Sequence, residues 1–377
     1  MKTLNILILA TSDQEKLVQT CRNRGHNPIL KRPTDLSLYV SDNPKGFDSV
    51  YDDENGGKLK IKDIDAVITR IGSNAAYARA VVEHLQHNLG IFCVQSAEAM
   101  RTASDKFLSA QKFSQNGIKV PKQWYAHSPK SAKHMIDKLG KLPVILKEQT
   151  GSQGAGIILL ESSLQTNMTL QAYYHKDIRL ILQEFIDNGG KDERHIVVDD
   201  KICCSMERQA PKHDIRANVS LEGTAKSIDP DDETKEVVLD MVKSIPNLNF
   251  AGCDVIKRKN DDGSQTIFAL EINSNPGSKI IDVTGHNYFE DLLDYVEENH
   301  KKGGNGGSAQ SLLTSDAHTK DERIKRITQD IMSNPDKYAI AFNKVRGYHW
   351  PVTTMKDVIL KNPESYATEI IRENIKV

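Results

Sequence analysis

The sequence predicts an α/β fold with a parallel sheet at its N-terminal end, followed by an α+β region and a small helical C-terminal appendage. Over the first 100 residues, apolar strand patterns alternate with helical patterns, which is typical of a parallel sheet covered by helices. Strand patterns then dominate up to a glycine-rich stretch at 302–308, which has the composition of a flexible linker. The expected domains are a βα domain at 1–100, an α+β body at 101–300 with subdomains at 101–186 and 187–300, a linker at 301–310, and a helical appendage at 311–377.

The N-terminal domain begins with an apolar strand at 5–9. A helical pattern covers 13–24, and Gly25 is placed to end that helix. The remaining expected elements are strands at 65–69 and 91–94 with a helix at 77–87 between them.

The body begins with a helix capped by Ser104 or Asp105 and extending to about Gln115, because Gly117 and Pro121 both oppose its continuation. Apolar strand patterns follow at 143–147, 156–160, 180–186, 195–198 and 251–256. In the appendage, helical spacing at 319–332 and 363–376 is interrupted by Pro335 and Pro351.

The composition excludes several classes of protein. A formal net charge of -1 with 27% charged residues does not fit a general nucleic-acid binder. The five cysteines are scattered without Cys-x-x-Cys spacing, so we expect reduced, structural cysteines. No signal peptide and no membrane-length apolar stretch is recognised. We therefore expect a cytoplasmic protein that binds neither membranes nor nucleic acid directly.

One segment has the composition of a phosphate-binding loop. Lys147 ends a strand and is followed by a loop whose glycines would let backbone N–H groups approach phosphate oxygens. The pattern is neither Walker A nor a dinucleotide-binding fingerprint, because a strand follows it. A tight glycine hairpin with a surface lysine is about equally consistent with this segment alone. The candidate loop residues are Gly151, Ser152, Gln153, Gly154 and Gly156.

A second segment predicts a metal site on a β-hairpin. If Asp262 and Gly263 form a two-residue turn, Asp254 lies opposite Glu271, and Asn273 faces the same side. Opposed carboxylates destabilise a hairpin unless a cation lies between them, and all-oxygen ligands suit Mg²⁺. Solvent-facing carboxylates are the alternative, which the apolar strand around Glu271 disfavours.

A third segment is an apolar strand that ends in Gln183, Glu184, Phe185 and Ile186 and then becomes polar. Such a segment could offer backbone groups to a purine. Three further polar residues are expected by default to be solvated at the surface: Arg208, Arg216 and Asn218.

Taken together and in order, these segments resemble the RimK-type ATP-grasp ligases, which attach glutamate to the C-terminus of a small-subunit ribosomal protein or make related amides. The resemblance covers about residues 1–300 and implies an ATP-grasp fold preceded by a pre-ATP-grasp domain. The motifs that carry it are Arg70-Ile71-Gly72, Ser104-Asp105-Lys106, the loop 151–156, Gln183-Glu184-Phe185-Ile186, Asp192-Glu193-Arg194, Asp214-Ile215-Arg216-Ala217-Asn218, Ala251-Gly252-Cys253-Asp254 and 271–277.

The resemblance implies a role for each matching residue. Lys106 and Lys147 would bind phosphates under a lid formed by Gly151–Gly156. The hinge that binds adenine would be 184–186, with Gln183 beside it and Asp192 near the nucleoside. The Mg²⁺ ligands would be Asp254, Glu271 and Asn273, and the groups facing the transferred phosphoryl and the carboxylate would be Arg194, Arg216 and Asn218.

The implied activity is ADP-forming ligation of a carboxylate to an amine through an acyl phosphate, with ATP and two Mg²⁺ or Mn²⁺ ions. The implied partners are an amino acid such as glutamate and a protein or peptide acceptor, a ribosomal protein being one example. Assembly as a dimer or tetramer is also implied.

The chain departs from the family pattern at Leu221-Glu222-Gly223, where a basic residue and two glycines are usual. The identity of the amino acid and acceptor, the number of residues added and the role of the appendage therefore stay open. A phosphotransferase with this fold and a catalytically silent nucleotide-binding protein are the alternatives. Retention of both lysines and all three metal-ligand candidates argues against the silent protein.

Overall fold

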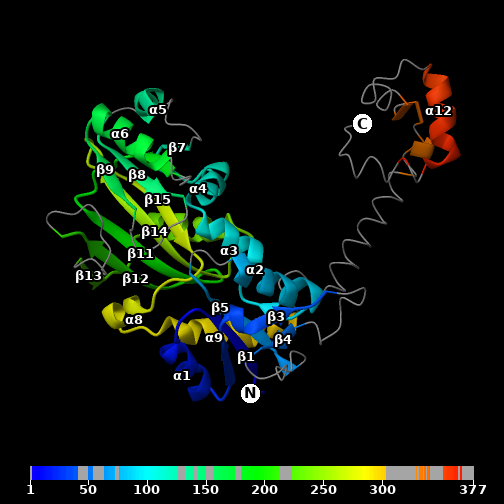
Figure 1. Ribbon diagram of the computed structural model, residues 1–377, viewed down its shortest axis with the longest axis horizontal. Helices are drawn as coiled ribbons and strands as arrows, with labels where there is room; N and C mark the ends of the chain where they lie inside the picture. Colours follow the sequence, from blue (N-terminus) through cyan, green and yellow to red (C-terminus); the bar gives the residue numbers. More distant parts are fainter. Residues whose placement is uncertain are drawn as a thin grey trace. The chain divides into compact units, whose positions relative to one another are not determined.

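The computed structural model describes most of the N-terminal 302 residues and part of the C-terminal region. The described residues are 2–40, 50–53, 63–72, 76–125, 132–139, 142–149, 156–174, 180–211, 223–302, 328, 331–333, 335–336, 338–339, 351–363 and 366. The chain divides into two compact units, Met1–Asn305 and Gly306–Val377 (Figure 1).

The N-terminal part of the first unit is a four-stranded parallel sheet, which confirms the expected βα alternation. Its strand order is β2-β1-β5-β6, in which β1 is the apolar strand at the start of the chain. The sequence did not predict β2 or the small antiparallel pair β3 and β4. The elements are β1 (Asn5–Ala10), α1 (Glu15–Asn23), β2 (Asn27–Lys31), β3 (Leu36–Leu38), β4 (Val50–Asp52), β5 (Ala66–Arg70), α2 (Ala76–Glu83), a π-helical turn (His84–Asn88) and β6 (Phe92–Cys93).

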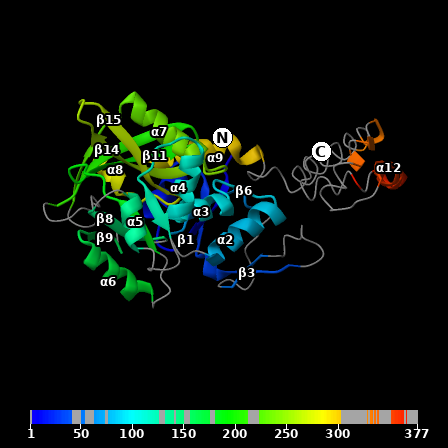
Figure 2. The same ribbon diagram turned by 90° about the horizontal axis from the view of Figure 1, so that it is seen from above.

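The central part is an antiparallel sheet in the order β7-β10-β8-β9. Apolar side chains of α5 and α6 pack on this sheet in one cluster, and Figure 2 shows α6 next to β8 and β9. The elements are α3 (Ala97–Ser104), α4 (Lys106–Gln115), β7 (Gln123–Tyr125), α5 (Ala132–Leu139), β8 (Val144–Glu148), β9 (Ile158–Leu160), α6 (Ser163–Tyr174) and β10 (Leu180–Glu184).

A second antiparallel sheet, with the order β13-β12-β11-β14-β15, supplies most of the charged residues discussed below. Strand β11 begins at Lys191, so residues expected in a polar loop are part of the sheet, and β12 was not predicted. Helix α7 lies beside β14 and β15 (Figure 2). The elements are β11 (Lys191–Val198), β12 (Lys201–Gln209), β13 (Thr224–Ser227), α7 (Asp232–Lys243), β14 (Phe250–Lys259) and β15 (Gln265–Asn273).

The β14–β15 hairpin has the expected pairing of Asp254 with Glu271, but its turn and its register differ from those predicted. The turn is one residue longer than predicted, because Lys259 pairs with Gln265 and Asn260 N–H donates to the carbonyl of Ser264. A bulge between Val255 and Asp254 then shifts the register by one residue. Asp254 consequently lies opposite Glu271, as the sequence predicted from the wrong turn.

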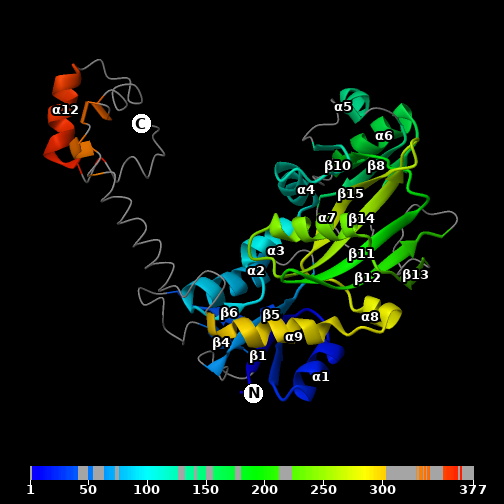
Figure 3. The ribbon, with the colours of Figure 1, turned by 180° about the vertical axis from the view of Figure 1, so that it is seen from behind.

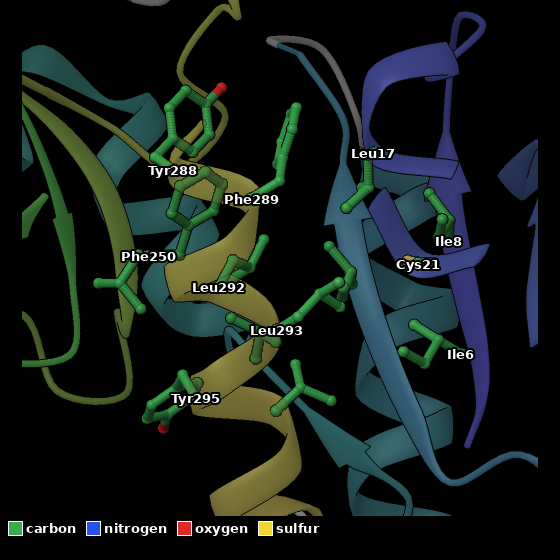
Figure 4. Packing of buried hydrophobic residues seen from close by; sticks show 14 of the residues in the cluster. Ile6, Ile8, Leu17, Cys21, Phe250, Tyr288, Phe289, Leu292, Leu293 and Tyr295 are labelled. Atoms are coloured by element: carbon green, nitrogen blue, oxygen red, sulfur yellow. The ribbon is translucent and has the colours of Figure 1, made fainter. Parts of the chain in front are cut away.

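The last α-helix of the first unit packs against the elements at the start of the chain. Helices α8 (Lys279–Thr284) and α9 (Tyr288–Asn299) follow β15, and α9 lies beside α1 in Figures 1 and 3. Figure 4 shows aromatic and leucine side chains of α9 between Phe250 of β14 and the β1 and α1 side chains Ile8 and Leu17. One apolar cluster therefore joins the N-terminal sheet to the five-stranded sheet.

In the second unit the structure describes α12 (Val352–Lys361) and a small apolar cluster around Met355 and Ile359. The expected linker from 303 onward and most of 319–332 and 363–376 lie outside the described residues. None of the helices in the described parts of the chain is long and apolar enough to cross a membrane. None of the five cysteines, all of which lie among the described residues, takes part in a disulfide bond.

Candidate active site

Charged side chains from neighbouring strands form a connected network on one face of the five-stranded sheet. Arg194 of β11 donates to both carboxylate oxygens of Asp254 of β14, at 2.7 and 2.6 Å. Arg208 of β12 donates to both oxygens of Asp192 of β11, at 2.6 and 2.7 Å, and its Nη2 lies 3.1 Å from Asp254. The two arginines and two aspartates therefore compensate one another's charge.

Asp254 stays ionised in this network although it is buried, with 3% of its surface exposed. Burial acts to raise the pKa of the carboxyl group, but the charges of Arg194 and Arg208 outweigh burial and lower the pKa to about 2. An ionised carboxylate at this position is the form that can bind a metal ion.

Arg208 corrects one expectation from the sequence. It was expected to be solvated at the surface, yet only 3% of it is exposed, because its guanidinium group is held between two carboxylates. Asp192, expected near the nucleoside, has both oxygens bonded to Arg208. Burial raises the pKa of Asp192, and the charge of Arg208 opposes that effect.

Glu271 extends the network to the edge strand β15 and to helix α4. It is the cross-strand partner of Asp254, and Lys106 Nζ lies 3.4 Å from its carboxylate. Asn273 is two residues further along β15 and therefore shares the same face. Lys106 is thus one of the cations next to the proposed metal ligands.

The donor set fits Mg²⁺ as a partial site. Asp254, Glu271 and Asn273 offer oxygen atoms from one face of a hairpin, which is the ligand type that Mg²⁺ prefers, and substrate phosphates commonly complete its coordination. No cluster of three or more His, Cys, Asp or Glu side chains suited to a metal occurs in the part of the chain described here. The expected ligand set contains only two carboxylates, and its third member is the amide of Asn273.

Lys147 approaches the site from the antiparallel sheet of the central part. It is buried in β8, and its Nζ donates to Gln183 Oε1 of β10 at 2.6 Å. The pKa of Lys147 is lowered to about 8, mainly by burial; the charge of Glu271 opposes this effect and the charge of Lys106 adds to it. These electrostatic effects mean that both lysines and Glu271 lie close enough to act on one another.

The N-cap residue of α4, Asp105, connects the start of that helix, where Lys106 lies, to the segment after Lys147. Asp105 caps α4 by accepting from the N–H groups of Phe107 and Leu108, as one of the two expected caps. Its other carboxylate oxygen accepts from Gln149 Nε2 at 2.7 Å, and Lys106 N–H donates to the Gln149 carbonyl. Gln149 was not singled out in the sequence, because its role depends on a partner 44 residues away.

The predicted adenine hinge follows β10. The backbone N–H of Glu184 donates to the carbonyl of Lys122, and the Glu184 side chain accepts from the backbone N–H of Lys122. Ile186 packs in an apolar cluster with Ile256 and Phe268. Contacts of the Glu184 and Ile186 side chains thus hold this segment in place. Phe185 is half-buried.

Several predicted residues lie outside the described part of the chain, so their positions are not part of the site geometry. They are Gly151, Ser152, Gln153, Gly154, Arg216, Asn218, Leu221 and Glu222. Gly156, at the end of the predicted loop, has φ +76°. The positive φ favours glycine, and a Cβ atom there would lie 3.0 Å from the Glu148 carboxyl group, so the Glu148 side chain would have to shift.

Comparison with known proteins identifies the family. A family model described as the RimK-like ATP-grasp domain matches residues 103–296, and one described as the RimK PreATP-grasp domain matches residues 4–100. The probable alpha-L-glutamate ligase of Coxiella burnetii is 32% identical over 305 residues, which cover 79% of this chain and 97% of the relative. The corresponding protein of Haemophilus influenzae is 30% identical and covers 76% of this chain and 94% of the relative.

Solved structures agree in fold. The ATP-grasp ligase PsnB, complexed with a precursor variant, Mg and ADP, superposes with a TM-score of 0.60 at 17% identity, covering 79% of this chain and 99% of PsnB. D-alanyl-alanine synthetase A of Vibrio cholerae gives 0.57 at 14% identity, covering 80% and 99%. The expected ATP-grasp fold is confirmed by the family models and the solved structures, and the expected ligase class by the relatives named above. The chain belongs to the RimK-like ATP-grasp family.

Proposed function

We propose that this protein uses ATP to convert a substrate carboxylate into an acyl phosphate and then joins it to the amine of an amino acid such as glutamate, at the terminus of a protein or peptide. The relatives named probable alpha-L-glutamate ligases support the choice of amino acid. PsnB, solved with a precursor peptide, supports a peptide acceptor. A ribosomal protein is one acceptor to test, because of the resemblance described above.

The observation that carries the proposal is the convergence of cations and oxygen ligands. Lys106 lies 3.4 Å from Glu271, and Lys147 is close enough for Glu271 to raise its pKa. Asp254 is the cross-strand partner of Glu271. Lysines next to carboxylates are suited to bind a triphosphate together with its metal ion.

The residues of the chain would share the work of phosphoryl transfer. Lys106 and Lys147 would neutralise the phosphates, and Arg194 would turn toward the transferred phosphoryl group and the substrate carboxylate. Asp254, Glu271 and Asn273 would hold Mg²⁺, which supplies charge neutralisation at the phosphate oxygens. The attacking group is the substrate carboxylate itself, so no protein nucleophile is required.

Residues outside the described parts complete the proposal. The loop Gly151–Gly156 would cover the triphosphate and exclude water, which would otherwise hydrolyse the acyl phosphate. Arg216 and Asn218 would face the substrate carboxylate. A cytoplasmic location and assembly as a dimer or tetramer belong to the same proposal.

The experiment that tests the function identifies both substrates at once. The purified protein is incubated with ATP, Mg²⁺, mixed amino acids and cell extract, and proteins are analysed by mass spectrometry for added residues. An added amino acid mass at a protein terminus, together with ADP release, is the expected result. ATP-dependent phosphate addition without any amide product would instead assign a phosphotransferase.

Isotope transfer then tests the acyl phosphate. Once an acceptor is known, its reacting carboxylate is labelled with ¹⁸O, and the released phosphate is analysed. An acyl-phosphate route transfers one labelled oxygen to phosphate, because that oxygen bridges carbon and phosphorus before the amine attacks. Unlabelled phosphate would rule out carboxylate activation.

A further inference from the structure

Gln95 joins three segments that are distant in the sequence. It follows β6, and only 1% of it is exposed. Its side-chain Nε2 donates to the carbonyl oxygens of Phe250 and Ser274, the latter at 2.7 Å. Its Oε1 accepts from Thr69 Oγ1 at 2.6 Å, so both ends of the amide are bonded.

The two carbonyl groups lie just beyond the end of the β14–β15 ladder. The last ladder pair is Gly252 with Asn273, and Phe250 and Ser274 lie past it on either strand. An amide nitrogen carries two hydrogens, so one side chain can bond both carbonyl groups. Gln95 thus connects the strands where their own hydrogen bonds stop, directly after the metal-ligand candidate Asn273.

A second buried donor holds the same segment two residues later. Arg70, at the end of β5, donates from Nη2 to the carbonyl of Pro276 at 2.8 Å and from Nε to Gln14 Oε1 at 2.9 Å. Its guanidinium carbon lies 5.8 and 5.5 Å from the ring centres of Phe250 and Phe289. Stacking on two rings fixes the direction in which this arginine donates.

Close packing gives the segment no room to move toward β14. A Cβ atom added at Gly252 would lie 2.8 Å from the Cβ of Pro276. The hydroxyl group of Tyr288 also donates to the Pro276 carbonyl, at 3.3 Å. The stretch from Ser274 to Pro276 is therefore held by the N-terminal sheet, β14 and α9 together.

We infer that Gln95 is a positioning residue for the metal site: by holding the Ser274 carbonyl it fixes the direction in which Asn273 presents its amide oxygen to Mg²⁺. The inference rests on the metal-ligand role proposed for Asn273. Partners that orient metal ligands affect metal affinity strongly, and their loss typically costs 10- to 100-fold. The N-terminal domain thereby contributes to metal binding without touching the metal.

The test measures metal binding directly, without turnover. Mn²⁺ binding to the full chain saturated with the ATP analogue AMP-PNP is followed by electron paramagnetic resonance. Gln95→Glu keeps the acceptor for Thr69 but places a carboxylate oxygen against the two carbonyl groups. We expect it to weaken Mn²⁺ binding about tenfold or more. AMP-PNP binding without metal should be unchanged.

Gln95→Met provides a second variant of similar size without charge, in case the carboxylate prevents folding. The matched control is Asn249→Ala. The Asn249 amide also donates across the same boundary, to the Val94 carbonyl at 2.9 Å, but makes no hydrogen bond to the described residues 274–276. It should lower the melting temperature to a similar extent as Gln95→Met while keeping the Mn²⁺ affinity of the wild type.

The outcomes separate the inference from the proposed function. Wild-type Mn²⁺ affinity in a folded Gln95 variant, or an equal loss in Asn249→Ala, overturns the positioning role and leaves the proposed function untouched. Absence of Mn²⁺ binding by the wild-type complex overturns the metal site itself. Weakened binding confined to the Gln95 variants establishes the inference.

Discussion

Arg194 and Asp254 are cross-strand neighbours joined by two parallel hydrogen bonds of 2.7 and 2.6 Å. Asp254 is also one of the three residues proposed to bind Mg²⁺, so Arg194 neutralises the carboxylate that the metal would bind. A metal ion bound to Asp254 would compete with Arg194 for this carboxylate. Arg208 keeps contact with Asp254 from the other side.

The buried ion pairs of Arg208 should matter for stability. Replacing one partner of a buried pair leaves an uncompensated charge, so we expect Arg208→Met to lower the free energy of unfolding by about 3–5 kcal/mol. Urea unfolding measures the change. Lys191→Met is the matched control, because Lys191 bonds Glu207 at 3.3 Å but is 52% exposed. It should cost less than about 1 kcal/mol, and an equal loss in both variants would contradict the burial argument.

The buried Lys147 predicts a pH dependence of nucleotide binding. Its pKa of about 8 means that the ammonium group is lost as the pH rises above that value. Phosphates favour the charged form, so AMP-PNP affinity should fall by up to about tenfold per pH unit above this pKa. Calorimetry in buffers of different ionisation enthalpy should detect proton uptake on binding. In Lys147→Arg, which keeps its charge, uptake as large as in the wild type would exclude Lys147 as its source.

The same lysine has the opposite effect on folding. Its pKa in the unfolded chain is near the ordinary value of 10.5, so between about 8 and 10.5 the unfolded state binds more protons. The contribution of Lys147 to stability therefore rises with pH across this window. Comparing the pH dependence of unfolding in wild type and Lys147→Met measures it. The sign would be contradicted if the free energy of unfolding of the wild type, minus that of Lys147→Met, fell or stayed flat as the pH rises.

Removing the carboxylate at position 271 should separate folding from catalysis. Glu271→Ala is expected to abolish Mg²⁺-dependent ADP release while the protein stays folded, because the side chain lies on the edge strand and is proposed to bind the metal. Glu207→Ala is the control, since Glu207 is a carboxylate of the same sheet that bonds the exposed Lys191 and Lys226. Undiminished ADP release by Glu271→Ala would refute the metal assignment.

Gly252, the glycine of β14, should be hard to replace. A methyl group would meet the Cβ of Pro276 at 2.8 Å, so Gly252→Ala should cost about 1–3 kcal/mol of stability through overpacking. Gly277→Ala is the comparison, because no described heavy atom lies within 4 Å of its added Cβ. Thermal unfolding of the two variants tests the difference. Similar losses of stability in the two variants would show that the loss comes from the backbone freedom of glycine and not from overpacking against Pro276.

Much of the fold was predictable because local patterns determine it. The apolar strand β1, the capped helix α4 and the opposed pair Asp254 and Glu271 all follow from short-range sequence signals. The hairpin is instructive, since a turn one residue longer than expected and a bulge cancel each other. The right facing pair was therefore predicted from an incorrect turn, because a local pattern does not reveal a bulge further along the strands.

Other features could not be predicted from local patterns. The burial of Arg208 depends on carboxylates 16 and 46 residues away, and a lone arginine in a polar strand looks like a surface residue. Gln95 gave no signal at all, because its three partners lie 26, 155 and 179 residues away in the chain. Long-range polar contacts of this kind become visible only in three dimensions.

The position of the turn in the β14–β15 hairpin allows a practical use of the protein. Several ladder pairs and the bulge separate the exposed tip around Asp261 and Gly263 from Asp254 and Glu271. Exposed loop tips tolerate insertions. A fluorescent tag or a tethering peptide could therefore be inserted at this tip to report on the enzyme, or immobilise it, without disturbing its chemistry.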